Sequence, residues 1–309
     1  MARKKIALIG GGQIGGILAL ILAQKSLGDI VIVDLPEKSG QMRAKMLDIM
    51  ACAPQDGQDA ELIGSGDMAD IAGADVVAIT AGVPRGPGMS REDLLDINLK
   101  IIRNVAQAVK QHAPNAFVVI TTNPLDSIVY AFHKESGLPH SQIAGMAGAL
   151  DSARFKAFIA QGAGVSVKDV ACLVMGGHGP TMIPLVRTAT IGGVPISDIL
   201  TTEQIAEIVE HTRNAGTEIV KLMEHGSAFY SAAAAVAQMV EAFILDKKRV
   251  IPSAVYCQGQ FAIEGYFVGV PAVIGGSGVE SIIEFKLNTE EQKMLDITLA
   301  AVKESVAKL

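Results

Sequence analysis

Among the six histidines of the sequence, His178 stands in the least ordinary setting. It is the centre of the segment Gly-Gly-His-Gly-Pro at 176–180, directly after the apolar run 170–175. Glycines on both sides allow tight backbone turns and close approach of a ligand. An imidazole has an ordinary pKa of about 6.5, so it can accept and return a proton near neutral pH. His178 is therefore a candidate acid/base, although a lone histidine is more often structural.

Two arginines follow the apolar run 75–79, in the glycine- and proline-containing segment 80–91. Arg85 and Arg91 lie six residues apart, and Gly86 and Gly88 flank Pro87, a composition typical of a lid that moves as a body. Arginine is the side chain best suited to bidentate binding of a carboxylate. The simpler interpretation is a solvated loop with two ordinary surface arginines.

Three further polar residues lie at the ends of predicted elements. Asp151 and Arg154 begin the predicted helix 150–162, and their spacing of three places them on one face. Asn123 follows the apolar run 117–120 and can both donate and accept a hydrogen bond. The alternatives are an intrahelical ion pair for the first two and an ordinary turn before Pro124 for the third.

A glycine-rich turn follows the first apolar run, 5–9. It reads Gly10-Gly11-Gly12-Gln13-Ile14-Gly15, so that Gly10, Gly12 and Gly15 have G-x-G-x-x-G spacing. This spacing is typical of a strand-to-helix turn whose free N–H groups bind a pyrophosphate. Asp34 ends the next apolar run and lies nineteen residues past Gly15, where an acid binds a ribose 2′-OH. The carboxylate would repel a 2′-phosphate, which favours NAD over NADP.

Short apolar runs and helical patterns alternate through the first half. The predicted strands are 5–9, 30–33, 61–63, 75–79 and 117–120, with helices at 14–26, 40–52 and 91–111. This rhythm predicts an α/β fold with a doubly wound parallel Rossmann sheet. The second half has strand-like segments at 181–191, 250–256 and 266–274 and helices at 202–223, 227–245 and from 289. We expect an α+β substrate domain with antiparallel strands at 148–309, after a dinucleotide-binding domain at 1–147.

The composition excludes several classes of partner. The net charge is −6 and no basic run follows a phosphate backbone, so we expect no nucleic acid. The apolar segment 227–245 contains Gln238 and Glu241, so we expect a buried helix and no membrane span. Three dispersed cysteines indicate free thiols in a cytoplasmic protein, and no Cys/His cluster has metal-ligand spacing. The apolar fraction of 50% favours a homo-oligomer, a dimer or a tetramer.

Taken in order, these segments resemble the lactate/malate dehydrogenase family over essentially the whole chain. The matching motifs are the segment 10–15, Asp34, Thr80-Ala81-Gly82, Arg85 with Arg91, Thr122-Asn123-Pro124, the segment 150–155 and the segment 177–179. The resemblance implies reversible hydride transfer between a 2-hydroxy acid and NAD. Arg85 points to the malate branch, because the lactate enzymes usually have glutamine there. The substrate would then be a dicarboxylate.

The resemblance also implies a role for each candidate. His178 would be the acid/base, Asp151 would orient its imidazole and stabilise the protonated form, and Arg91 would polarise the substrate carbonyl. Arg154 would bind the C1 carboxylate, Arg85 the second carboxylate, and Asn123 the substrate oxygen. The nicotinamide side would be lined by Asn98, Thr121, Thr122 and Asn123.

Two alternatives stay open at this point. The first is a dehydrogenase for lactate or another 2-hydroxy acid, against which Arg85 argues, because a buried arginine without a second carboxylate is costly. The second is a non-catalytic NAD-binding regulatory protein. That alternative predicts the loss of at least one of His178, Asp151, Arg154 and Arg91, yet all four are present.

Overall fold

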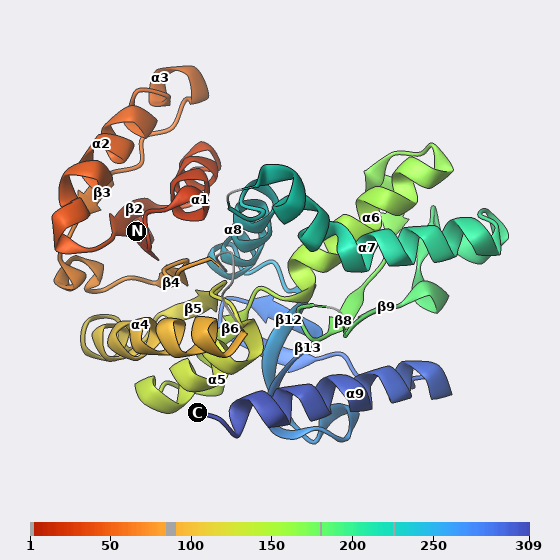
Figure 1. Cartoon of the computed structure of the whole chain (residues 1–309). Helices are drawn as coiled ribbons and strands as arrows, with labels where there is room; N and C mark the ends of the chain where they lie inside the picture. Colours follow the sequence, from red (N-terminus) through yellow and green to blue (C-terminus); the bar gives the residue numbers. More distant parts are fainter. Residues whose placement is uncertain (1–2, 85–90, 180, 225) are drawn as a thin grey trace.

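The computed structural model describes residues 3–84, 91–179, 181–224 and 226–309, without the side chain of Arg91 (Figure 1). The strands and helices follow in the order β1 (Lys5–Ile9), α1 (Gln13–Gln24), β2 (Asp29–Val33), α2 (Ser39–Met50), α3 (Ala53–Asp56), β3 (Leu62–Ser65), β4 (Val76–Ile79), α4 (Arg91–His112), β5 (Phe117–Ile120), α5 (Leu125–Ser136), β6 (Ile143–Gly145), α6 (Gly148–Ala163), β7 (Val170–Ala171), β8 (Val174–Gly176), β9 (Met182–Pro184), β10 (Thr190–Ile191), β11 (Val194–Pro195), α7 (Thr202–Met223), α8 (Tyr230–Ile244), β12 (Arg249–Gln258), β13 (Glu264–Gly275), β14 (Gly278–Ile282) and α9 (Thr289–Val306).

The first six strands form a parallel sheet in the order β3-β2-β1-β4-β5-β6. This is the strand order of a Rossmann fold, so the predicted fold class is confirmed. The central strands β4 and β5 are buried along their whole length, as the continuous apolar runs predicted. In β1, Ile9 pairs with Val33 on one side and with Ile79 on the other.

Helices cover both faces of this sheet, because side chains of one strand alternate between them. Ile6 and Leu8 of β1 belong to a core cluster with α1 and α8. Ala7 and Ile9 belong to the opposite cluster, which is completed by α4 and α5. Helix α8 comes from the second half of the chain, so the two halves share a core; its Phe243 stacks on Phe117 of β5 with ring centroids 4.9 Å apart.

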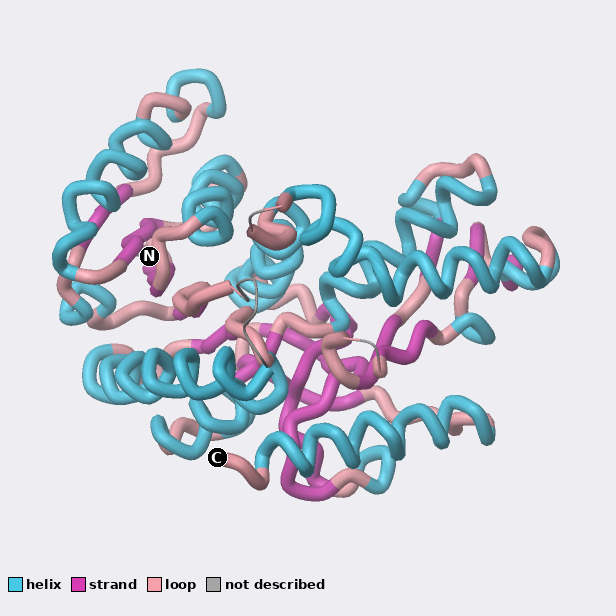
Figure 2. Tube along the Cα trace, viewed as in Figure 1, coloured by secondary structure: helices cyan, strands magenta, loops and turns pink. Residues whose placement is uncertain are grey.

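The second half continues the same sheet with antiparallel strands. Strand β12 pairs with β6 through Ala254 and Gly145, and the order continues as β13-β8-β9. Figure 2 shows the strands extending from the N-terminal part, beside α1 and α2, into the centre of the molecule, with helices around them. Helices α6 and α7 pack on each other, as Figure 1 shows. The boundary predicted at residues 147 and 148 lies between β6 and α6 and remains a prediction.

Some predicted elements differ from the structure. The segment 181–191 does not form one strand: β9 ends at Pro184, a 3-10 turn follows at Val186–Thr188, and β10 is only Thr190–Ile191. The last residue of β9, Pro184, has no N–H to donate to a strand ladder. Helix α5 and the short strands β6 and β14 were not predicted. Within the described residues, no helix is both long and apolar enough to span a bilayer.

The parallel topology determines where the site forms. The carboxyl ends of β1, β2, β4, β5 and β6 lie at one edge of the sheet, and the segments that follow them carry most of the predicted site residues. These segments begin at Gly10, Asp34, Thr80, Thr121 and Met146. Ligands of open α/β sheets bind at this edge, near the point where the strand order reverses.

Candidate active site

The glycine turn after β1 packs too tightly for side chains at two of its positions. Gly10 has φ of +107°, and a Cβ there would lie 2.4 Å from the backbone nitrogen of Ala81. A Cβ on Gly15 would lie 2.0 Å from the carbonyl oxygen of Gly10. Gly12, in contrast, has no atom within 4 Å of its Cβ position. The turn is therefore closed toward the protein and open at Gly12, where α1 begins without a side-chain cap.

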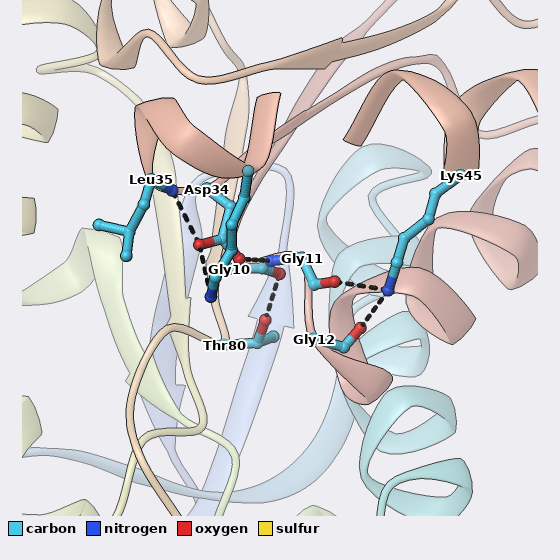
Figure 3. Close-up of polar contacts among 8 residues, drawn as sticks. Gly10, Gly11, Gly12, Asp34, Leu35, Lys45 and Thr80 are labelled. Atoms are coloured by element: carbon cyan, nitrogen blue, oxygen red, sulfur yellow. Dashed lines mark hydrogen bonds and ion pairs between the residues drawn. The ribbon is translucent and has the colours of Figure 1, made fainter. Parts of the chain in front are cut away.

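Asp34 lies at the carboxyl end of β2 and faces this turn (Figure 3). Its Oδ2 accepts the Gly11 N–H at 2.8 Å, its Oδ1 accepts the Leu35 N–H at 2.8 Å, and Lys38 lies 3.3 Å from Oδ1. Burial raises the pKa of this carboxyl, but the two N–H groups and Lys38 outweigh it, so the pKa lies below its ordinary value. Asp34 is thus an ionised carboxylate held beside the glycine turn.

Lys45 of α2 is a residue that the sequence did not single out. Its Nζ donates to the carbonyl oxygens of Gly11 at 2.6 Å and Gly12 at 3.3 Å, as Figure 3 shows. It therefore holds the turn from outside the motif and adds a positive charge near the start of α1. No sequence spacing links Lys45 to the turn, because the contact depends on how α2 packs.

The segments that follow β4 and β5 are joined to each other by hydrogen bonds. Asn98 of α4 is fully buried, and its amide bonds the backbone of Val83 and the carbonyl oxygen of Asn123, the latter at 2.7 Å. Thr121 donates to the Ile79 carbonyl at 3.1 Å and Thr122 to the Ala81 carbonyl at 2.6 Å. Asn123 itself is exposed, at a cis bond to Pro124. These contacts hold the backbone at Asn123 beside the carboxyl ends of β4 and β5.

His178 and Asp151, which are 27 residues apart, meet in the structure. The His178 Nδ1 lies 2.9 Å from Asp151 Oδ2, and the Asp151 side chain is 1% exposed. Arg154 Nη1 donates to the other carboxylate oxygen, Oδ1, at 3.3 Å. The Nε of Arg154 is buried and has no partner among the described residues. The predicted acid/base, its carboxylate partner and one predicted carboxylate-binding arginine therefore form one contiguous group.

Two contacts bring this group together. Helix α6 begins at Gly148, where a Cβ would lie 2.4 Å from the carbonyl oxygen of Val174 in β8. Ser152 Oγ accepts the Val174 N–H at 2.8 Å. Because the first turn of α6 is fixed against β8, Asp151 faces the loop that follows β8 and carries His178.

The surroundings favour the protonated form of His178. Burial and the charge of Arg154 lower the pKa of its imidazole. The charge and hydrogen bond of Asp151, together with the charge of Asp126, raise this pKa by more. The pKa therefore lies above its ordinary value of 6.5. Asp126, in the first turn of α5, is a second residue that the sequence did not single out.

Arg85 and the side chain of Arg91 lie outside the described residues, so the structure leaves both as predictions. Helix α4 begins at Arg91. The described residues contain no group of three or more histidine, cysteine, aspartate or glutamate side chains that could hold a metal ion.

Comparison with known proteins decides the family. The family described as lactate/malate dehydrogenase, NAD binding domain, matches residues 4–145, and the lactate/malate dehydrogenase alpha/beta C-terminal domain matches residues 148–309. The chain belongs to the lactate/malate dehydrogenase family. Two similar family members are the malate dehydrogenase of Myxococcus xanthus, 52% identical over 98% of this chain and 97% of the relative, and that of Geobacter sulfurreducens, 51% identical over all of both chains.

Solved structures of this family carry both names. The malate dehydrogenase of Cryptosporidium parvum is 43% identical and superposes with a TM-score of 0.96 over 99% of each chain. The lactate dehydrogenase of the same organism, complexed with lactic acid and NAD, is 44% identical, with a TM-score of 0.95 over 99% of this chain and 98% of that chain. Because these values are nearly equal, overall likeness does not separate the two substrates within the family.

The N-terminal half is an NAD-binding domain of this family, and its turn fits the cofactor. Gly12 leaves open space at the uncapped start of α1, where N–H groups and the helix dipole favour a pyrophosphate. Asp34 holds an ionised carboxylate beside this turn, which suits a ribose hydroxyl as its hydrogen-bond donor. We propose that residues 10–15 and Asp34 hold the adenosine and pyrophosphate part of NAD, and that the segment 121–123 with Asn98 shapes the nicotinamide side.

Replacing Asp34 with serine is expected to weaken the preference for NADH over NADPH. The change removes the charge that repels a 2′-phosphate and a charged hydrogen bond worth roughly ten- to hundredfold in affinity. The ratio of kcat/KM for NADPH to that for NADH should rise about tenfold or more. Asp29→Ser, at the other end of β2, is the matched control and should leave the ratio unchanged. An unchanged ratio in Asp34→Ser would rule out this role.

Proposed function

We propose that this chain catalyses the reversible oxidation of (S)-malate to oxaloacetate with NAD. The observation that carries the proposal is the His178–Asp151 pair, in contact through Nδ1 and Oδ2 at 2.9 Å, with Arg154 on the same carboxylate. Two observations support malate as the substrate. Relatives with 51% and 52% sequence identity bear the name malate dehydrogenase, and the sequence contains Arg85.

Asp151 determines which ring nitrogen of His178 exchanges a proton with the substrate. With Nδ1–H donated to Asp151, the lone pair of Nε2 is free to take the proton of the substrate hydroxyl. NAD, when bound, supplies the nicotinamide that takes up the hydride from the substrate carbon that bears this hydroxyl. The imidazolium that forms is stabilised by the buried Asp151 carboxylate. In the reverse direction the imidazolium returns the proton to the carbonyl oxygen of oxaloacetate.

Arg154 is suited to hold the C1 carboxylate of the substrate. Its Nη1 is engaged by Asp151, whereas its buried Nε has no partner among the described atoms. A buried unpaired donor is costly, and an incoming carboxylate would satisfy it. We assign Asn123 to the substrate oxygen, Arg91 to the polarised carbonyl and Arg85 to the second carboxylate. A dicarboxylate would then be selected because Arg154 and Arg85 each bind one carboxylate.

The test of this function is a steady-state assay of NADH oxidation with oxaloacetate beside pyruvate, repeated with NADPH. We expect kcat/KM for oxaloacetate to exceed that for pyruvate by at least about 10², since pyruvate would leave Arg85 without the carboxylate partner that oxaloacetate supplies, at a cost of about 3 kcal/mol. A preference for pyruvate would favour the lactate alternative. The likeness to the Cryptosporidium parvum lactate dehydrogenase is the observation that supports this alternative. Turnover of neither would contradict both.

The raised pKa of His178 predicts opposite pH dependences for the two directions. Malate oxidation needs the neutral imidazole, so its kcat/KM should rise with pH, with a midpoint above 6.5. Oxaloacetate reduction needs the imidazolium, so its kcat/KM should fall as pH rises through the same value. Initial rates from pH 5 to pH 10 with saturating cofactor measure both. Midpoints below 6.5, or the same trend in both directions, would contradict the assignment of His178.

We also propose that the protein is a cytoplasmic homo-oligomer. Large apolar side chains are exposed on α2 and at the carboxyl end of α7, among them Leu47 at 63% and Leu222 at 75%. A second copy of the chain would cover such side chains at an interface. The three cysteines are free thiols, as is usual in a reducing compartment. Light scattering of the purified protein measures whether it is a monomer, dimer or tetramer.

A further inference from the structure

Asp126 is a second carboxylate beside the loop that carries His178, and it comes from a different helix than Asp151. It lies in the first turn of α5, three residues after Asn123, and its carboxylate accepts the backbone N–H of His178. A Cβ on the neighbouring Gly177 would lie 3.5 Å from Asp126 Oδ2. The other oxygen, Oδ1, is buried and has no hydrogen-bond partner among the described residues. One carboxylate oxygen therefore remains unpaired beside the loop that carries the acid/base.

Helix α9 also contacts this loop, through an uncharged side chain. Thr298 of α9 is fully buried, and its Oγ1 donates to the carbonyl oxygen of Thr181 at 2.8 Å. The described segments 177–179 and 181 thus contact residues of both α5 and α9. Like Asp126, Thr298 holds the loop, but it adds no charge.

The charges that act on the His178 imidazole come from two helices. Asp151 and Arg154 belong to α6, and Asp126 belongs to α5. Burial raises the pKa of Asp126 to about 6, against the lowering effects of the His178 charge and the His178 N–H. At neutral pH the Asp126 carboxyl is therefore mainly ionised and adds a second negative charge near the imidazolium.

We propose that Asp126 is a positioning residue of the reaction: its carboxylate fixes the loop that carries His178 and places a second negative charge beside that loop. The inference rests on the proposed function, in which His178 exchanges a proton with substrate. Asp151 orients the imidazole, and Asp126 sets, together with it, the pH at which the proton is exchanged. A purely structural cap at the start of α5 would affect stability and leave that pH unchanged.

Asp126→Asn is the decisive variant, because the amide keeps the shape and an oxygen to accept the N–H but carries no charge. We expect the midpoint of the pH profile of kcat/KM for oxaloacetate reduction to fall by about half a unit or more. Asp126→Glu, which restores a carboxylate, should return the midpoint toward the wild-type value. Thr298→Val removes the uncharged loop contact and should alter kcat or KM while leaving the midpoint in place.

A second measurement needs neither turnover nor an Asp126 variant. In the resting wild-type enzyme with ¹³C-labelled histidine, the His178 ring signal, assigned with His178→Asn, should show a minor inflection near pH 6 from Asp126 beside its own titration. The inference is overturned if wild-type enzyme reduces oxaloacetate but Asp126→Asn keeps the wild-type midpoint, or if the His178 signal titrates as one isolated group. An enzyme inactive on oxaloacetate whose His178 signal still shows both ionisations would overturn the proposed function alone.

Discussion

Replacing His178 with asparagine is expected to lower kcat for oxaloacetate reduction by about 10³-fold, within the 10²–10⁴ range of a general acid/base. Asparagine can still donate toward Asp151, so the buried carboxylate keeps a partner and the fold should survive. It has no group that titrates near neutral pH, so the proton must come from water. NADH binding, measured by fluorescence titration, should change less than about threefold, because the glycine turn lies on other elements.

His211→Asn is the matched control for this prediction. His211 is a half-exposed histidine on α7 that contacts Glu218 at 3.0 Å. Its loss should leave kcat within about twofold of wild type, as for most surface substitutions. If His178→Asn retained more than a tenth of the wild-type kcat, another group would have to be the proton donor, and the Asp151–His178 contact would be structural.

Changing Arg85 to glutamine is expected to reverse the choice of substrate. The second carboxylate of oxaloacetate would lose its cationic partner, which lowers kcat/KM by about 10² or more. Pyruvate has no second carboxylate to leave unpaired, so its kcat/KM should rise or stay constant. The ratio of the two specificity constants, measured with saturating NADH, should therefore fall by more than about 10².

Two controls separate the position of this residue from the mere loss of a positive charge. Arg249→Gln removes an exposed arginine at the start of β12 and should leave the ratio unchanged. Arg85→Lys keeps the charge but loses bidentate geometry, so an intermediate ratio is expected. An Arg85→Gln enzyme whose oxaloacetate kcat/KM stays within a few-fold of wild type would show that the second carboxylate binds elsewhere.

The cofactor half could be predicted from the sequence because its signals are local. A strand such as 117–120 is a continuous apolar run, since both of its faces are covered, and the glycine turn needs small residues at fixed spacing. Short elements gave no such signal. Strand β6 has three residues, and β9 stops at Pro184 after three, too few for a period to be visible.

The catalytic group could be predicted only residue by residue. His178, Asp151 and Arg154 were candidates from their types and settings, but their contact depends on the packing of Gly148 against β8. Asp126 and Lys45 were not singled out from the sequence, and helix α5, which carries Asp126, was not predicted. Their partners are the His178 N–H and two glycine carbonyls, backbone groups that no residue pattern records.

The unbroken sheet has a consequence for how such an enzyme can change during evolution. Exchange of one half for that of a distant relative would have to rebuild the pairing of Gly145 with Ala254 and the stacking of Phe117 on Phe243. A fragment ending at residue 147 would expose the open edge of β6 and the apolar face that α8 covers. Recombination between the halves is therefore a poor route to a new substrate. A point substitution at a candidate specificity residue such as Arg85 does not require either contact between the halves to be rebuilt, so new specificities should arise by such substitutions first.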